Sequence, residues 1–160
     1  MLTQERLFQE LFYDELSGEF WWNKPAPRRD ISKPAGHYDD RGYVRITIDG
    51  TKHYGHRLAV LYMTGSMPAE HVDHINHDKG DNSWTNLRLA TPAQNQWNQG
   101  SKATNTSGYK GVRAKGNRYD ARIRVNGKRY ELGRYDTAEE AAAAYEAAAS
   151  KYHGEYAKVL

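Results

Sequence analysis

The chain has 160 residues and no cysteine, so disulfides and cysteine-ligated zinc sites are excluded. Its length allows one ordinary domain or two small ones. Apolar residues make up 38%, and no apolar run approaches the roughly 20 residues of a membrane span. The acidic, amphipathic start does not fit a signal or transit peptide. We therefore expect a soluble protein of the cytoplasm that has no membrane partner.

Positive charge is concentrated in one part of the chain. Residues 101–135 hold ten Lys and Arg against two Asp and Glu, a net charge of +8. The whole chain carries only +3, so the remainder sums to −5. This asymmetry favours a polyanion-binding module attached to a different module. A basic surface that is merely solvated is the alternative.

The first third of the chain predicts a helix, a short strand, a hairpin and a second helix. Leu and Phe recur at helical spacing over residues 1–16. A turn and the aromatic run 20–22 follow, and the run predicts a strand. Residues 42–56 predict a hairpin, because the Asp-Gly pair at its centre favours a type I′ turn. Residues 56–65 predict a short helix that ends near its glycine.

Three histidines, His71, His74 and His77, follow at three-residue spacing in the segment HVDHINHDKGDNSWTNLRLATPAQN. Ordinary polar loop residues are one interpretation. A three-histidine metal cluster is a second, weakened because strand residues alternate between opposite faces. A third makes Asp73 and His74 an active pair: the carboxylate would bind a divalent cation, and an imidazole with a pKa near 6.5 could take a proton from water. Asn95 would add a second oxygen ligand.

The last fifty residues predict three antiparallel strands and one helix, over 108–116, 118–125, 128–135 and 139–154. Along the second strand Tyr119, Ala121, Ile123 and Val125 alternate with charged residues. An Asn-Gly pair predicts the tight turn that follows this strand. The small polar residues 99–107 predict a linker before this region.

The predicted C-terminal helix has a start signal and an apolar stripe. Thr137 and Glu140 predict a capping box. A stripe of small and aromatic residues would pack on the apolar face of the sheet: Ala141, Tyr145, Ala148 and Tyr152. The opposite face of the sheet would remain a flat platform rich in arginine, and a ribbon of this width can enter the major groove of DNA.

The segment NTSGYKGVRAKGNRYDARIRVNGKRYELGRYDTAEEAAAAYEAAASKYHGEYA resembles an AP2 DNA-binding domain over nearly all its length. Members of that family grip DNA through the sheet. The resemblance implies DNA contacts from Lys110, Gly111, Arg113, Lys115, Arg122, Arg124 and Arg129. The pattern common in plants has Trp where this chain has Gly116-Asn117 and Glu131, so the plant target sequence does not carry over.

The pieces VDHIN, DN, TNLR and ATPAQNQWN over residues 72–98 resemble the HNH nuclease motif in its H-N-N form, found in phage and intron homing endonucleases. The lead-in GYVRITIDGTKHYGHRLAVLYMTG is usual in such phage proteins. The resemblance implies a ββα-metal fold in which VDHI and LRLA are the strands and Pro92 starts the helix. It makes His74 the general base, Asp73 and Asn95 the ligands of Mg²⁺ (or Mn²⁺), and Asn86 the brace of the loop that orients His74.

Together these features predict an α+β protein of two modules. Residues 1–98 form a ββα-metal nuclease with an N-terminal extension, and residues 108–160 form an AP2-like domain, a three-stranded antiparallel sheet packed on one helix. The predicted function is Mg²⁺-dependent hydrolysis of double-stranded DNA, by a monomer or a weak dimer on DNA. A non-catalytic DNA-binding regulator and an RNA nuclease are the alternatives.

Several features stay open from the sequence: the target site, the number of strands cut, the source element, and the roles of His71, His77 and Asp78. One physical problem is also visible. Neighbours on a regular strand face opposite ways, so Asp73 and His74 can face one phosphate only at a strand end or a bulge. We expect such a distortion at this point.

Overall fold

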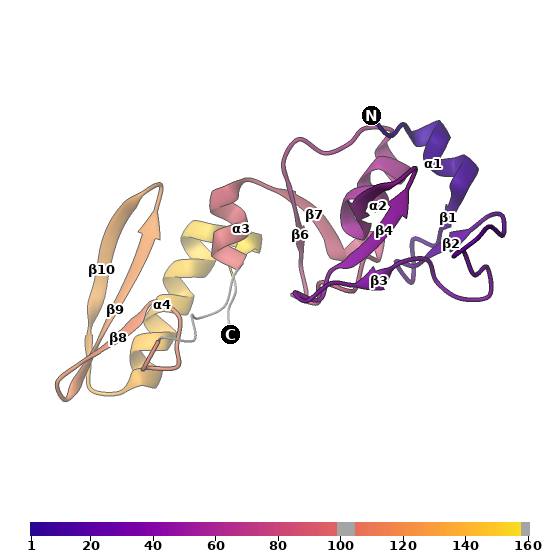
Figure 1. Ribbon diagram of the computed structural model, residues 1–160. Helices are drawn as coiled ribbons and strands as arrows, with labels where there is room; N and C mark the ends of the chain where they lie inside the picture. Colours follow the sequence, from indigo (N-terminus) through magenta and orange to yellow (C-terminus); the bar gives the residue numbers. More distant parts are fainter. Residues whose placement is uncertain (99–104, 158–160) are drawn as a thin grey trace. The chain divides into compact units, whose positions relative to one another are not determined.

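A computed structural model describes residues 1–98 and 105–157 (Figure 1). Its contacts divide the chain into two compact units, Met1–Pro92 and Ala93–Leu160. We expected the first module to extend to residue 98, whereas residues 93–98 group with the second unit. Of the predicted linker 99–107, positions 99–104 lie outside the described residues. In the described ranges, no helix has both the length and the apolar character that crossing a bilayer demands.

The first unit contains short helices and three small antiparallel sheets, with strand orders β1-β2, β3-β4-β5 and β6-β7. Apolar side chains of α1, α2 and the first two sheets share one core, which includes Leu7, Leu11, Ile46, Leu58 and Leu61. The elements in chain order are α1 (Gln4–Glu10), β1 (Leu11–Tyr13), β2 (Phe20–Trp22), β3 (His37–Tyr38), β4 (Val44–Ile48), β5 (Thr51–Tyr54), α2 (Gly55–Thr64), β6 (His71–His74), the 3₁₀ turn η1 (Trp84–Asn86) and β7 (Leu87–Ala90).

The first helix is shorter than predicted. α1 ends at Glu10, and the next three residues form β1, which pairs with β2. In β1, Leu11 and Tyr13 are buried while Phe12 is exposed, the alternation of a strand. The prediction of a helix to residue 16 is therefore wrong, because pairing with a distant strand outweighs local helical spacing.

The next two predictions are confirmed. Asp49 and Gly50 have φ values of 48° and 77°, so both central residues of the β4–β5 turn are left-handed, as a type I′ turn requires. Helix α2 ends at Gly65, also left-handed, whose N–H donates to the carbonyl of Leu61. Strand β3 was not predicted, since its two residues are too few to show a pattern.

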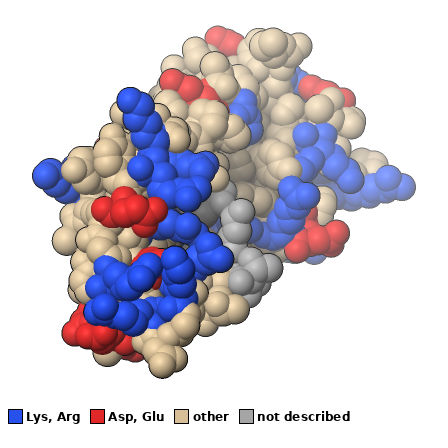
Figure 2. Space-filling view, turned by 90° about the vertical axis from the view of Figure 1, so that its left-hand side faces the viewer, with Lys and Arg blue, Asp and Glu red and all other residues tan. Residues whose placement is uncertain are grey.

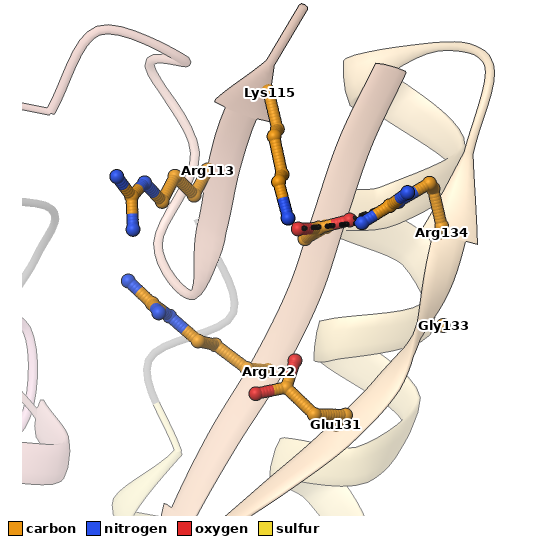
Figure 3. A pocket seen from close by; sticks show the side chains of 7 residues that line it. Arg113, Lys115, Arg122, Glu131, Gly133 and Arg134 are labelled. Carbon is orange, nitrogen blue, oxygen red and sulfur yellow. Dashed lines mark hydrogen bonds and ion pairs between the residues drawn. The ribbon is translucent and has the colours of Figure 1, made fainter.

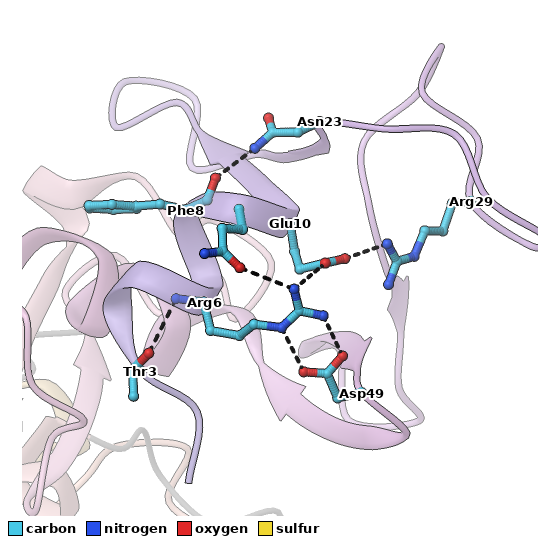
Figure 4. Close-up of polar contacts among 8 residues, drawn as sticks. Thr3, Arg6, Phe8, Glu10, Asn23, Arg29 and Asp49 are labelled. Carbon is cyan, nitrogen blue, oxygen red and sulfur yellow. Dashed lines mark hydrogen bonds and ion pairs between the residues drawn. The ribbon is translucent and has the colours of Figure 1, made fainter.

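Polar contacts fasten α1 to the rest of the first unit (Figure 4). Thr3 caps the helix by accepting from Arg6 N at 3.2 Å. The Arg6 guanidinium forms ion pairs with Asp49, at 2.7 Å, and with Glu10, also at 2.7 Å. Glu10 in turn pairs with Arg29. This network ties the helix to the β4–β5 turn and to the loop after β2.

The second unit is an antiparallel sheet with one helix on it, as predicted. The strand order is β10-β9-β8, and the Asn-Gly turn joins β9 to β10. Thr137 and Glu140 form the predicted capping box of α4. The elements are α3 (Pro92–Asn98), which begins at the boundary of the units, β8 (Val112–Lys115), β9 (Arg118–Val125), β10 (Lys128–Tyr135), α4 (Ala138–His153) and the 3₁₀ turn η2 (Gly154–Tyr156).

The predicted apolar stripe of α4 is wrong at one residue, Tyr152. Ala141, Tyr145 and Ala148 are buried against the sheet, but Tyr152 is 45% exposed. His153 takes the inward place: it is buried, and its Nε2 lies 3.1 Å from the carbonyl oxygen of Arg124. At 3.6 residues per turn both positions follow the stripe, so spacing alone did not separate them.

Candidate active site and basic surface

The β6–β7 hairpin places Asp73 and His74 at the end of a strand. Asp73 lies opposite Arg88 and His74 opposite Leu87, with no shift of register. The side chains of Asp73 and His74 are both buried, at 7% and 5% exposure. The strand stops at His74, so the expected distortion takes the form of a strand end rather than a bulge.

The carboxylate of Asp73 is oriented from the neighbouring strand. Arg88 donates to Asp73 Oδ2 from Nε at 3.0 Å and from Nη2 at 2.9 Å. Both side chains are largely buried, at 11% and 8% exposure. Removing one partner of such a pair leaves the other charge buried and uncompensated, so each residue depends on the other.

The imidazole of His74 is enclosed by polar and aromatic groups. Its Nε2 lies 3.2 Å from Oδ1 of Asn82. The ring of His56 meets it edge-on with centroids 5.1 Å apart, and the ring of Tyr43 lies 6.0 Å away. Burial lowers the pKa of His74, although the bond to Asn82 and the charge of Asp73 oppose this shift. The ring is therefore neutral at neutral pH, the state that a general base requires.

Asn86 ties together the loop between the two strands. Its Oδ1 accepts from the backbone N of Asn76 at 2.9 Å, and its Nδ2 donates to the carbonyl of Asp81 at 2.8 Å. Its own carbonyl accepts from Ile75 N at 2.9 Å. Asn86 is buried. These three bonds act where the resemblance to HNH nucleases placed a bracing residue.

The remaining predicted residues of this region lie in different places. His71 starts β6 and is exposed, and His77 is exposed with a φ of 69°. Asp78 accepts from Gly80 N at 2.9 Å inside the loop. No group of three or more His, Asp or Glu among residues 1–98 and 105–157 could hold a metal alone, so the three-histidine cluster gains no support. Asn95 lies on α3 and stays a predicted ligand.

Sequence reasoning missed four residues around the active pair: Tyr13, His56, Asn82 and Arg88. His56, in the first turn of α2, is buried, and burial lowers its pKa to about 3. Its Nδ1 has no hydrogen-bond partner in the described part of the chain. Asn82 belongs to the Asp-Asn piece of the motif, and Arg88 to the piece TNLR. Of the four, only Asn82 and Arg88 could have been found from the sequence, because they belong to the motif. Tyr13 and His56 are far from His74 in the sequence and belong to no motif piece.

The outer face of the β8–β10 sheet collects cations, and Figure 2 shows Lys and Arg gathered on the nearer face of the molecule with a few carboxylates among them. Arg113, Lys115 and Arg122 project from β8 and β9 toward a shared depression of about 560 Å³ (Figure 3). The residues that line it are Arg113, Lys115, Asp120, Arg122, Glu131, Gly133 and Arg134.

The cations of this face divide into paired and unpaired groups. Arg134 pairs with Asp120 at 2.6 Å, and Arg118 pairs with Asp136 at 2.8 Å. Within the ranges that the structure describes, five of the predicted DNA contacts have no ion pair. These five are Arg113, Lys115, Arg122, Arg124 and Arg129.

Two predicted contacts have roles inside the second unit. Lys110 donates from Nζ to the carbonyl of Trp97, and the indole of Trp97 stacks on His153 with centroids 4.3 Å apart. Through these contacts α3 packs against the rest of the second unit. Gly111 has a φ of 72°, and a Cβ there would stand 2.0 Å from the ring of Tyr145, so close packing requires glycine at this position.

Comparisons with known proteins agree with this geometry. A family model described as HNH endonuclease matches residues 53–97, which include the β6–β7 hairpin. A protein of Acanthamoeba polyphaga mimivirus named as an uncharacterized HNH endonuclease is 37% identical over 130 residues, 79% of this chain and 67% of the relative. The chain belongs to the HNH endonuclease family. Membership implies nuclease activity.

Two further comparisons cover less of this chain. Protein 3.8 of Escherichia phage T7 is 31% identical over 90 residues, 55% of this chain and 74% of the relative. A solved structure described as DNA binding and cleavage by the HNH homing endonuclease I-HmuI shares 24% identity with this chain, with a TM-score of 0.42. That match covers 56% of this chain, and the chain spans about half, 51%, of the solved one.

Proposed function

We propose that this chain is a metal-dependent DNA endonuclease of the homing type, placed on its target by the AP2-like sheet. The observation that carries the proposal is the buried pair at the end of β6. Asp73 and His74 are adjacent, more than nine-tenths buried and each held by a second side chain. A soluble domain gains little stability from burying such a pair, because burial of an ionised carboxylate is costly.

The chemistry assigned to His74 follows from its neutral ring. The imidazole accepts a proton from water, and the water oxygen attacks the phosphorus of a phosphodiester. The bond between phosphorus and the 3′-oxygen breaks, and this oxygen takes up a proton from solvent. The products carry 5′-phosphate and 3′-hydroxyl ends. In this scheme Asn86 holds the loop that follows His74 and does not touch the DNA.

The proposed cofactor is a divalent cation, Mg²⁺ with Mn²⁺ as a substitute. Asp73 offers a carboxylate and Asn95 an amide oxygen, which are ligands that hard cations prefer. Mg²⁺ commonly uses one or two carboxylates and completes its shell with water and substrate phosphates, so it does not need a cluster of three acidic residues. When bound, the cation would polarise the phosphate and stabilise the leaving oxygen. Arg88 keeps the carboxylate of Asp73 in one orientation.

Double-stranded DNA is the proposed partner of the sheet. Arg113, Arg122 and Arg124 form no ion pair in the described ranges, so their guanidinium groups can pair with phosphates. A sheet of this width can enter the major groove, where arginine can also read base edges. The predicted contact of Lys110 is the weakest of the set, because its ammonium already donates to Trp97.

One observation favours a second candidate, a DNA-binding regulator that does not cut. Arg88 donates twice to Oδ2 of Asp73 and already neutralises the carboxylate that a cation would bind. In a regulator this ion pair would be permanent and no cation would enter. The two candidates therefore differ in their response to Mg²⁺.

The experiment incubates supercoiled plasmid with the full chain in Mg²⁺, in Mn²⁺ and in EDTA, followed by gel electrophoresis. The proposal predicts nicked or linear DNA with either cation, none in EDTA, and nicks that DNA ligase reseals because the ends are 5′-phosphate and 3′-hydroxyl. An intact plasmid that is nevertheless bound would favour the regulator. Cleavage of RNA but not of DNA under the same conditions would favour an RNA nuclease.

A further inference from the structure

The β1–β2 hairpin contacts the loop that holds His74. The Tyr13 hydroxyl donates to the carbonyl of Asn82 at 2.7 Å, and Trp84 N donates to the carbonyl of Glu15 at 2.8 Å. Gly18 has a φ of 76°, and a Cβ there would stand 2.3 Å from the carbonyl carbon of Asn82. The hairpin thus approaches the loop as closely as backbone allows. The residues that match the HNH family model begin at 53, so the hairpin lies outside that match.

Asn82 is the residue on which these contacts converge. It is 1% exposed, and its Nδ2 donates to the carbonyl of Gly80 at 3.2 Å. A carbonyl can only accept, so this bond fixes which end of the amide is the NH₂ group. The amide oxygen then faces Nε2 of His74, at 3.2 Å. Because that oxygen can only accept, Nε2 must carry the proton of the neutral ring.

We infer that Asn82 is a positioning residue that fixes the tautomer and orientation of His74, and that the β1–β2 hairpin holds Asn82 in place. With the proton on Nε2, the lone pair of the neutral ring is on Nδ1, which is then the nitrogen that can take a proton from water. The inference rests on the proposed function in one respect, the assignment of His74 as the general base.

The hairpin is suited to this task because Tyr13 is itself rigid. Tyr13 is 4% exposed, and its ring stacks on Phe20 with centroids 4.7 Å apart. Burial raises the pKa of Tyr13, so the hydroxyl keeps its proton and remains a donor. The N-terminal extension is then part of the catalytic unit, since it supports the base through one hydrogen bond to Asn82.

The test compares three variants with the parent in the full chain. Asn82→Leu removes the acceptor, and Tyr13→Phe removes only the hydroxyl that holds Asn82. Tyr62→Phe is the matched control: the Tyr62 ring packs on Tyr13 with centroids 5.5 Å apart, and its hydroxyl forms no hydrogen bond to the described residues. Thermal unfolding verifies that each variant is folded. If Asn82→Leu fails to fold, Tyr13→Phe decides the result.

The first readout is the imidazole of His74 in protein labelled with ¹⁵N-histidine, measured by NMR near pH 7.5 without metal or DNA. The parent and Tyr62→Phe should show the Nε2–H tautomer, with a ring N–H proton that exchanges slowly enough to be observed. That proton signal should disappear in Asn82→Leu and broaden by faster exchange in Tyr13→Phe. An Nδ1–H tautomer in the parent, or unchanged signals in both variants, would overturn the inference.

The second readout is the cleavage of plasmid in Mg²⁺. Loss of one hydrogen bond that orients the base should lower kcat by about fivefold in Tyr13→Phe, and by more in Asn82→Leu, with KM unchanged. A rise of KM with constant kcat would contradict a positioning role. If the parent does not cut DNA, the proposed function fails, yet the NMR result still decides whether Asn82 fixes the ring.

Discussion

The first unit buries Asp73, His74 and His56, whereas the second unit keeps Arg113, Lys115 and Arg124 on its surface. In the first unit Asp73 is fixed by Arg88 and His74 by Asn82. In the second unit Arg113, Lys115 and Arg124 form no ion pair with a carboxylate in the described ranges. Ionisable side chains are thus buried and held by partners in the first unit and left exposed in the second.

This difference matches two separate tasks, proton transfer in the first unit and DNA binding in the second. A proton-transfer group must be dehydrated and fixed before the reaction, since orientation and pKa set its rate. A binding face for a polyanion needs exposed, hydrated cations. When these cations pair with phosphates, the counterions condensed on the DNA are released. Changes in the first unit should therefore alter the rate on bound DNA, and changes in the second should alter affinity.

The largest effect is expected from His74→Ala. Loss of a general base typically lowers the rate about 10²- to 10⁴-fold. Plasmid nicking in Mg²⁺ measures the rate, and a gel-shift titration in Ca²⁺ measures binding, which should not change. His71→Ala, in the exposed residue at the start of the same strand, is the control and should cut like the parent. Parental cleavage by His74→Ala would remove His74 from the mechanism.

The next effect concerns the basic face. Arg122→Ala with Arg124→Ala removes two unpaired cations, and each lost phosphate contact should lower the slope of log affinity against log salt by about 0.9. Arg118→Ala is the control, because Arg118 is already paired with Asp136. Fluorescence titrations of one duplex between 50 and 200 mM salt, the range over which such slopes are resolved, measure the slope. Equal slopes for the parent and the double variant would show that Arg122 and Arg124 make no phosphate contacts.

A smaller effect is expected from pH in the first unit. Unfolded His56 takes a proton near pH 6.5, whereas in the folded chain its pKa is about 3. Between these values the unfolded state binds more protons, so stability falls as pH decreases, by up to about 1.4 kcal/mol for each pH unit from this group. Urea unfolding between pH 7 and 5 should show a steeper loss in the parent than in His56→Phe. Parallel curves would show that folding does not lower the pKa of His56.

The smallest effect is expected from the helix under the basic face. Thr137→Ala removes the cap of α4 and should cost about 1 kcal/mol of stability. The helix packs on the apolar face of the sheet and the unpaired arginines project from the opposite face, so the salt slope of DNA binding should stay that of the parent. Thr137→Ser, which keeps the hydroxyl, should restore most of the stability in urea unfolding. If Thr137→Ala is folded to the same extent as the parent but has a different salt slope, then the helix contributes to DNA binding.

Local signals predicted much of this molecule. The Asp-Gly turn of the β4–β5 hairpin, the capping box of α4 and the alternation of β9 all follow from residues within a few positions of one another. Each signal depends on backbone preferences or motif spacing, which the sequence shows directly.

The contacts that enclose His74 could not be predicted in the same way. Tyr13 and Asn82 are 69 positions apart, and their hydrogen bond exists only because β1 is a strand instead of helix. His56 reaches His74 from α2, and Arg88 reaches Asp73 across the hairpin. Long-range packing decides these contacts. The motif marks Asn82 and Arg88 as positions, but the spacing of residues does not show which side chains they contact.

The division of labour is tested most directly by single-turnover cleavage of one labelled duplex over a range of protein concentrations in Mg²⁺. The plateau gives the rate on bound DNA, and the concentration at half the plateau gives affinity. His74→Ala should lower the plateau and leave the half-saturating concentration unchanged. Arg122→Ala with Arg124→Ala should raise that concentration and leave the plateau unchanged. A lower plateau in the double variant, or weaker binding in His74→Ala, would contradict the separation of chemistry from placement.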